Sequence, residues 1–226
     1  MYRHIWKKIL IEYFEDIITR DIVSRFSVEY EKVRDTAYYL ISNIGQRITL
    51  RKLRNVLSLG LETIEKYLDY LESVYMLFIV RRYSPKVKEQ IIAPKKVYAI
   101  DTGMANVIGY TTSENIGSFL GNIILVELKR RGFKVFYYQT NDKEIDFVVM
   151  ENRKIKELIN VTYTLDEEKT KKREIDSLLK GMRELATEKS TIITWDEKEN
   201  IQIGSKTIRI IPAYEWLLGT DANEKI

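Results

Sequence analysis

The chain has 226 residues, of which 45% are hydrophobic and 31% are charged, and this length can form one large domain or two small ones. It has no cysteine and one histidine, which excludes disulfides, thiolate metal sites and sites that need two histidine ligands. No apolar run approaches the roughly 20 residues that span a bilayer, and the N-terminus lacks a signal-peptide pattern. We therefore expect a cytoplasmic protein without a membrane partner.

Charge is distributed unevenly along the chain. The net charge is +4, with 37 Lys and Arg against 33 Asp and Glu. Residues 1–100 contain 18 basic and 12 acidic side chains, whereas residues 101–226 contain 19 and 21. A basic first half and a slightly acidic second half indicate two modules, and the basic one could meet an anionic surface such as DNA. A loop-rich zone over 102–121, with four glycines, places the boundary near 103–116, which gives domains of 1–102 and 103–226.

The first module begins with predicted helices. Apolar side chains recur at helical spacing over residues 2–26 and again over 29–42. Thr49 is positioned to cap a short helix that ends before Gly60, and a further helix follows over 61–76. These helices would precede the extended part of the module.

Two extended segments follow, over 77–83 and 95–100, and they predict a β-hairpin. Three helices followed by a hairpin are the order of a winged helix, a variant of the helix-turn-helix. We expect basic side chains of the hairpin and of the short helix to contact DNA phosphates. These candidates are Arg47, Arg51, Lys52, Arg54, Arg81, Arg82, Lys86, Lys88, Lys95 and Lys96.

The second module predicts one helix, three strands, a second helix and a further strand. The helices cover 117–131 and 166–186, and β-branched and aromatic residues mark the three strands, which lie over 134–139, 144–150 and 155–163. Together with the winged helix, this order predicts an α+β protein whose second domain is an α/β domain of the restriction-endonuclease-like, or PD-(D/E)XK, type. A short strand over 191–195 and two more toward the C-terminus complete the expected sheet.

That domain type holds Mg²⁺ or Mn²⁺ with carboxylates of adjacent strands, and a lysine assists the attacking water. Asp146 lies in the expected strand, but Asn160 and Thr162 fall where Glu-x-Lys would stand. Asp146 and Asn160 are therefore the candidate metal ligands. Lys156 shares the face of Asn160 by strand alternation, and Glu127 of the preceding helix could add a carboxylate. These four residues are the catalytic candidates, and the incomplete motif leaves open whether the chain is an enzyme.

Several segments of the second half and of the first module occur together in one order. They are Arg20-Asp-Ile-Val, Asn43-Ile-Gly-Gln-Arg-Ile-Thr, Lys95-Lys-Val-Tyr-Ala-Ile-Asp-Thr-Gly, Asn122, Glu127-Leu-Lys-Arg-Arg-Gly, Lys143-Glu-Ile-Asp-Phe-Val-Val, Asn160-Val and Ile193-Thr-Trp. Together they resemble the C-terminal region of a family of prokaryotic, especially archaeal, AAA+ ATPases. That region, of unknown function, joins a winged helix to a restriction-endonuclease-like domain. The family usually has Glu where this chain has Gly121, and usually Gln at the position of Asn160. None of the 10 glycines opens a Gly-x4-Gly-Lys-[Ser/Thr] pattern, so we expect no ATP binding of that kind.

The sequence leads to one principal interpretation and two alternatives. The principal one is a DNA-associated module with a degenerate nuclease-like domain, which serves an ATPase or acts alone. The first alternative is an active metal-dependent endonuclease, with branched DNA as a candidate substrate. The second is a protein-interaction module that docks on an ATPase or on a second copy of itself and binds no DNA.

Overall fold

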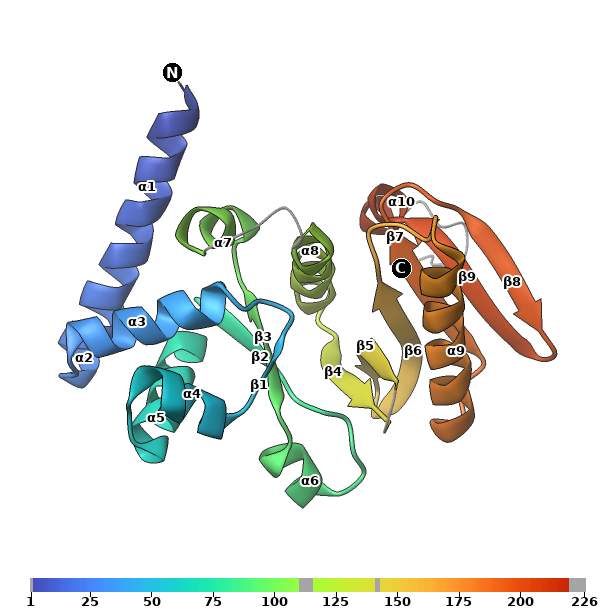
Figure 1. The fold of residues 1–226 in the computed structure, drawn as a ribbon, viewed down its shortest axis with the longest axis horizontal. Coiled ribbons are helices and arrows are strands. Elements are labelled where there is room, and N and C mark those ends of the chain that lie inside the picture. Colours follow the sequence, from blue (N-terminus) through green and yellow to red (C-terminus); the bar gives the residue numbers. More distant parts are fainter. Residues whose placement is uncertain (1, 110–115, 141–142, 220–226) are drawn as a thin grey trace. The chain divides into compact units, whose positions relative to one another are not determined.

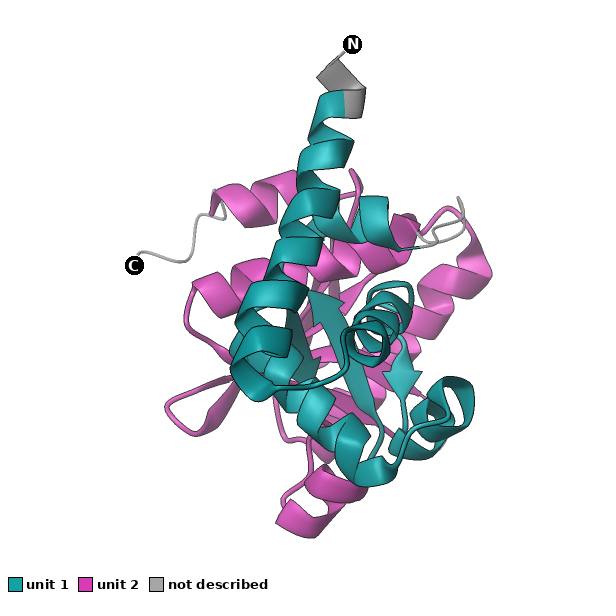
Figure 2. Ribbon diagram, turned by 90° about the vertical axis from the view of Figure 1, so that its left-hand side faces the viewer, with its two compact units in different colours: residues 1–80, 93–115 teal, residues 81–92, 116–226 magenta. Residues whose placement is uncertain are grey.

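The structure is a computed structural model that describes residues 2–109, 116–140 and 143–219. It confirms the α+β class. The chain forms two compact units, which Figure 2 shows in different colours. Unit 1 comprises 1–80 and 93–115, and unit 2 comprises 81–92 and 116–226. This division differs from the expected linear boundary at 102/103, because residues 81–92 cluster with the second half and residues 103–115 with the first.

Unit 1 begins with a long helical run that confirms the helix expected over 2–26. The run comprises α1 (Tyr2–Asp16), a π-helical segment (Ile17–Val23) and α2 (Ser24–Phe26). Ser27 ends it in the left-handed region with φ 51°, and α3 (Tyr30–Ile41) follows. Ile18 and Ile22 are fully buried, so the later part of the apolar stripe reaches the core as expected. Ile5 and Tyr13, which belong to the same periodic pattern, are exposed.

The rest of unit 1 combines short helices with a small sheet. Its helices are α4 (Leu50–Leu57), α5 (Leu61–Ser73) and α7 (Thr102–Ile108), and its strands are β1 (Arg47–Ile48), β2 (Leu77–Val80) and β3 (Lys95–Ala99). The Thr49 hydroxyl accepts a hydrogen bond from the Lys52 N–H at 3.1 Å, which confirms the predicted cap of α4. The strands are antiparallel in the order β1-β3-β2, so the expected pairing of β2 with β3 is present. The two-residue strand β1 was not predicted.

Unit 2 is built around a six-stranded sheet with the order β4-β5-β6-β7-β9-β8. The pairs β6·β7 and β7·β9 are parallel and the other pairs are antiparallel. The strands are β4 (Lys134–Gln139), β5 (Glu144–Glu151), β6 (Lys154–Val161), β7 (Lys189–Thr194), β8 (Glu199–Ile203) and β9 (Lys206–Pro212). The helices are α6 (Val87–Ile92), α8 (Ile116–Arg130), α9 (Glu168–Glu184) and α10 (Ala213–Leu218).

Helices α8 and α9 lie on opposite faces of this sheet (Figure 1). On one face, Val148 and Leu158 pack in a core cluster with Leu178 of α9. Their strand neighbours Val149 and Ile159 point to the other face and line a pocket with Leu128 of α8. Strand alternation thus produces a three-layer arrangement in which the two faces carry different side chains.

The segment between β2 and β3 was expected to form the wing of a winged helix. Its first residues instead pair with β4 of unit 2: Tyr83 donates its N–H to the Tyr137 carbonyl at 2.6 Å, and Tyr137 donates to the Arg81 carbonyl at 3.0 Å. Helix α6, which the polar sequence of this segment did not predict, follows. The edge strand β4 is therefore partly covered by residues that sequence order alone assigned to the first module.

Candidate functional site

Asp146 is held at the boundary between β5 and β6. The ladder between β4 and β5 shifts register between Phe136 and Tyr138, opposite the stretch of β5 that contains Asp146. Its backbone N–H donates to Oδ1 of Asn160 at 3.2 Å, and its Oδ2 accepts the N–H of Val161 at 3.1 Å. Both catalytic candidates predicted on adjacent strands are therefore in direct contact.

Asn160 extends this contact to helix α9. Its side chain is buried, with the residue 1% exposed. Its Nδ2 donates to Oε2 of Glu174 at 2.6 Å and to Oγ of Ser177 at 2.8 Å. We call Asp146, Asn160, Glu174 and Ser177 the amide–carboxylate cluster. Through the Asn160 amide, this cluster connects strands β5 and β6 to the second and third turns of α9.

Glu174 is the unusual acid of the cluster. Burial raises the pKa of its carboxyl above the ordinary value, and the nearby Asp146 carboxylate raises that pKa further. Hydrogen bonds from Arg173 and from Asn160 oppose both effects, with Arg173 Nη2 at 2.8 Å from Oε1. Two carboxyl groups that repel each other in a half-buried place are a known sign of a functional site, and also occur in purely structural networks.

The cluster does not fit a divalent metal ion as it stands. Oδ1 of Asn160, the oxygen expected to ligate the metal, accepts the Asp146 N–H instead. Both oxygens of Glu174 accept hydrogen bonds, one from Asn160 and one from Arg173. Over the described ranges, no group of three or more His, Asp or Glu side chains is close enough together to hold a metal. Thr162 donates to the Thr164 carbonyl, so it forms a local turn where the motif would need a lysine.

The expectation that Lys156 shares the face of Asn160 is wrong. The ladder between β5 and β6 shifts register, because Val149 pairs with Glu157 whereas Met150 pairs with Ile155. Lys156 is therefore an extra, bulged residue, and the period of two is broken at that point. Its Nζ lies 4.5 Å from the centre of the Phe133 ring, on the α8 face, and 3.4 Å from Oε1 of Glu151.

Glu127 also belongs to the α8 face. Its carboxylate accepts hydrogen bonds from Arg130 at 2.6 Å and 2.7 Å and from Arg131 at 2.7 Å. These guanidinium groups, first Arg130 and then Arg131, hold the pKa of Glu127 below its usual value although burial opposes them. Arg131 also donates to the Trp216 carbonyl at 2.8 Å, so Glu127 helps to fix α10 on α8. No contact links it to the amide–carboxylate cluster within the part of the chain that the structure describes.

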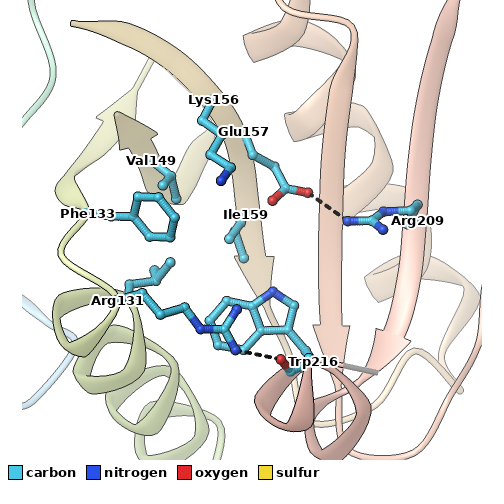
Figure 3. A pocket seen from close by; sticks show the side chains of 10 residues that line it. Arg131, Phe133, Val149, Lys156, Glu157, Ile159, Arg209 and Trp216 are labelled. Carbon is cyan, nitrogen blue, oxygen red and sulfur yellow. Dashed lines mark hydrogen bonds and ion pairs between the residues drawn. The ribbon is translucent and has the colours of Figure 1, made fainter. Parts of the chain in front are cut away.

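Figure 3 shows a pocket on the α8 face, to which Arg131, Lys156 and Trp216 contribute. Its free volume is about 30 Å³, roughly enough for one water molecule. Arg131 lies over the Trp216 ring at 4.2 Å, and Arg209 is 3.4 Å from the Glu157 carboxylate. Each basic side chain that lines this pocket therefore contacts an acid or an aromatic ring. The pocket is a packed network of charged side chains and has little space for a substrate.

The DNA-contact candidates of unit 1 divide into exposed and buried side chains. Arg51, Lys52 and Arg54 are exposed on α4, and Arg47 is exposed on β1. Lys96 of β3 is 2% exposed, so the expectation that it reaches a phosphate is wrong. Lys95, its neighbour on β3, is half-buried.

The candidates of the 81–92 segment are held by unit 2. Arg82 is half-buried, and its Nη2 donates to the Gln139 carbonyl at 2.9 Å, which corrects its expected role on a free wing. Lys86 is 3.3 Å from Glu89, whereas Arg81 and Lys88 are exposed. Docking of this segment on β4 therefore leaves fewer cations available for DNA than the sequence suggested.

Glu174 and Ser177 were missed by sequence reasoning. They lie three residues apart and share the inward face of α9 with Leu178 and Gly181, so polar residues on an apolar stripe were the available signal. Gly181 lets α9 approach the sheet closely, because an added Cβ would lie 2.1 Å from Cδ1 of Ile145. This close approach brings the second turn of α9 within hydrogen-bond reach of Asn160.

Comparison with known proteins gives relatives without an assigned role. An uncharacterized protein of Methanocaldococcus jannaschii is 33% identical over 231 residues, which cover 95% of this chain and 51% of that protein. An uncharacterized protein of Haemophilus influenzae is 29% identical over 217 residues, with 93% and 52% covered. The chain thus spans about half the length of these curated relatives. No solved structure matches it. Residues 3–114 match a family model described as a domain of unknown function, DUF8612.

Proposed function

We propose that the protein is a DNA-associated module that contacts the duplex backbone through unit 1 and carries a nuclease-like domain without a formed metal site in unit 2. Three helices and a sheet of order β1-β3-β2 agree with a winged helix. Helix, three strands, helix and a parallel fourth strand agree with the restriction-endonuclease-like order. Both agreements concern topology, so the function must be argued from side chains.

One observation carries the proposal: α4 presents a basic face that has no acidic partner. Arg51, Lys52 and Arg54 are exposed, and none of them forms an ion pair with another residue in the described ranges. Three uncompensated cations on two turns of helix attract phosphates and release counterions when they bind them. The basic face of α4 is thus suited to backbone contact, which positions a protein on DNA without reading its sequence.

Helix α5 argues against sequence-specific recognition. Its exposed side chains include four acids, of which Glu62 pairs with Lys66 at 2.8 Å. Acidic side chains on a recognition helix would be repelled by phosphates. The proposal is therefore limited to binding that is non-specific or depends on DNA structure. The remaining acids of α5 are Glu65, Asp69 and Glu72.

An active endonuclease is the second candidate, and one observation favours it. Glu174 brings a second carboxylate to the Asn160 amide that also contacts Asp146, although the sequence motif lacked that acid. Burial, and then the Asp146 carboxylate, raise the pKa of Glu174. A cation that displaced the hydrogen bonds of Asn160 could use both carboxylates. If Mg²⁺ or Mn²⁺ binds there, Asp146 and Glu174 would hold it, and the metal would supply an activated water.

An ATPase partner follows from the family resemblance. The two curated relatives are about twice as long as the region they share with this chain, which leaves room for a further domain in those proteins.

Among the residues that the structure describes, no helix is long and apolar enough to cross a membrane. A protein-interaction role without DNA remains the alternative, and the exposed Trp6 and Tyr13 of α1 are side chains that such a role would use.

Salt-dependent binding to a labelled DNA duplex tests the proposal. The triple variant Arg51→Ala, Lys52→Ala, Arg54→Ala should bind more weakly, and the slope of log affinity against log salt should fall by about 3. The control Lys154→Ala, Arg183→Ala, Lys189→Ala removes the same charge from exposed positions of unit 2 and should keep the wild-type slope. Equal slopes for both triple variants would overturn the proposal and favour the protein-interaction role.

Cleavage of the same duplex and of a four-way junction with Mn²⁺ decides between the first two candidates. The degenerate site predicts no cleavage. Cleavage that disappears in Asp146→Ala and in Glu174→Ala would establish the endonuclease instead.

A further inference from the structure

The carboxyl ends of the three parallel strands carry exposed aromatic side chains. Strand β6 is followed by Tyr163, β7 by Trp195 and β9 by Tyr214, with the residues 39%, 53% and 57% exposed. In α/β sheets this edge is where ligands bind, because strand ends and helix starts leave side chains pointing to solvent. Single exposed aromatic side chains are ordinary on a protein surface. Here three of them follow the ends of three neighbouring strands and therefore lie at the same edge of the sheet.

Two of these rings form a fixed pair. The Tyr163 and Trp195 rings stack with centroids 5.5 Å apart and planes 29° apart. The backbone holds them in register, because Trp195 donates its N–H to the Tyr163 carbonyl at 3.0 Å. The aromatic pair is therefore ordered before any ligand arrives, which lowers the entropic cost of stacking a further ring on it.

The aromatic pair lies next to the amide–carboxylate cluster along the chain. Val161, which donates its N–H to Asp146, precedes Tyr163 by two residues, or roughly 7 Å of extended chain. A strand of nucleic acid that met the cluster would thus have bases within reach of the rings.

The charged side chains that follow the aromatic pair's Tyr163 along the chain are of both signs. Lys169 and Lys172 are exposed on one face of the first turns of α9, where they can meet a phosphate. Asp166, Glu167 and Glu168 precede or open the same helix, so the edge is not uniformly basic. A mixed edge is poorly suited to a densely charged duplex, whereas stacking of a base on an aromatic ring adds affinity that does not depend on a cation.

We propose that Tyr163 and Trp195 are a stacking site for unpaired bases of DNA. Stacking tolerates any base because every base presents a flat π-face. The inference deepens the proposed DNA association by assigning unit 2 a preference for single-stranded segments, such as those at ends and junctions. It uses no step of cleavage.

Fluorescence anisotropy with a labelled oligothymidine of about twelve nucleotides, in EDTA, tests the site. Trp195→Ala and Tyr163→Ala should each weaken single-strand binding by on the order of tenfold. Trp195→Phe keeps a flat ring and should restore most of the affinity. Tyr38→Ala, an equally exposed tyrosine on α3 of unit 1, should bind as wild type. Wild-type affinity in both alanine variants, with unchanged circular dichroism, would overturn the inference.

A second pair of measurements separates this inference from the proposed function. The triple variant of α4 should lose duplex binding and keep the Trp195-dependent binding of the oligothymidine, whereas Trp195→Ala should keep duplex binding. If the α4 triple variant bound duplex as tightly as wild type while Trp195→Ala still weakened oligothymidine binding, the duplex proposal would be refuted and the stacking site would be supported. If Trp195→Ala bound oligothymidine as tightly as wild type while the α4 variant still weakened duplex binding, the stacking site would be refuted and the duplex proposal would be supported.

Discussion

The two faces of the six-stranded sheet hold polar groups in opposite ways. On the α9 face, the side-chain amide of Asn160 contacts both Asp146 and Glu174, and the pKa of Glu174 is raised. On the α8 face, Glu127 meets two guanidinium groups, and its pKa is lowered. The α9 face thus buries one acid beside another with a single guanidinium partner, Arg173, whereas the α8 face pairs its acid with two guanidinium groups. Neighbouring buried acids are typical of sites that bind cations or substrates, whereas matched pairs are typical of structural networks.

The largest expected effect is on the α9 face, where one buried amide joins three partners. Asn160→Leu keeps the volume but leaves the Asp146 N–H, the Glu174 carboxylate and the Ser177 hydroxyl without that amide. Buried groups that lose partners are costly, so we expect the free energy of unfolding in urea to fall by about 3 to 5 kcal/mol.

Thr162→Val is the matched control, two residues further along the chain. Its hydroxyl makes one local hydrogen bond to the Thr164 carbonyl and is half-buried. We expect a loss of less than about 1 kcal/mol. If Asn160→Leu were as mild as this control, the cluster would not be the structural centre of the α9 face.

A smaller effect is expected on the α8 face. Glu127→Gln removes the charge that binds Arg130 and Arg131, and should lower the free energy of unfolding by about 2 kcal/mol at neutral pH. Because the folded pKa of Glu127 is lowered, its contribution is present above the pKa of the unfolded chain. It is lost as the pH falls through the folded pKa, so wild type and variant should converge in acid.

The exposed pair of Glu62 and Lys66 on α5 provides the contrast. Glu62→Gln should leave the unfolding free energy within error of the wild type, because solvent screens an exposed pair. A Glu127→Gln variant that stayed as stable as wild type at neutral pH would show that the charge matching of the α8 face is incidental.

The elements of the fold follow from the sequence more closely than the sites do. Helical periodicity identified α3, α5 and α9, since one buried stripe is enough to define a long helix. Strand alternation failed at Lys156, because a one-residue bulge moves every preceding side chain to the other face. The burial of Lys96 and the docking of residues 81–92 on β4 depend on tertiary contacts that no local pattern encodes.

The candidate site was predicted only in part, because local sequence patterns do not encode contacts between distant segments. Asp146 and Asn160 were found because adjacent strands of a known order must place them side by side. Glu174 was missed because its contact depends on how closely Gly181 lets α9 approach the sheet. A helix-borne acid beside a strand-borne acid is a contact between distant parts of the chain, and sequence spacing carries no signal for it.

The smallest expected effect tests how the α9 face holds Glu174, whose pKa is raised by burial and by the nearby Asp146 carboxylate. A raised folded pKa means that protonated Glu174 contributes stability below the pKa of the unfolded chain, and that this contribution is lost as the pH rises through the folded pKa. Glu174→Gln mimics the protonated form and keeps an oxygen for the Asn160 amide. The variant should therefore melt at a higher temperature than wild type at about pH 7, and the difference should shrink toward about pH 4. Glu184→Gln on the same helix should retain the wild-type pH dependence. A Glu174→Gln variant that melted below wild type at neutral pH would mean that the hydrogen bonds of the carboxylate outweigh the cost of its burial and its repulsion from Asp146, and the two faces would then be alike.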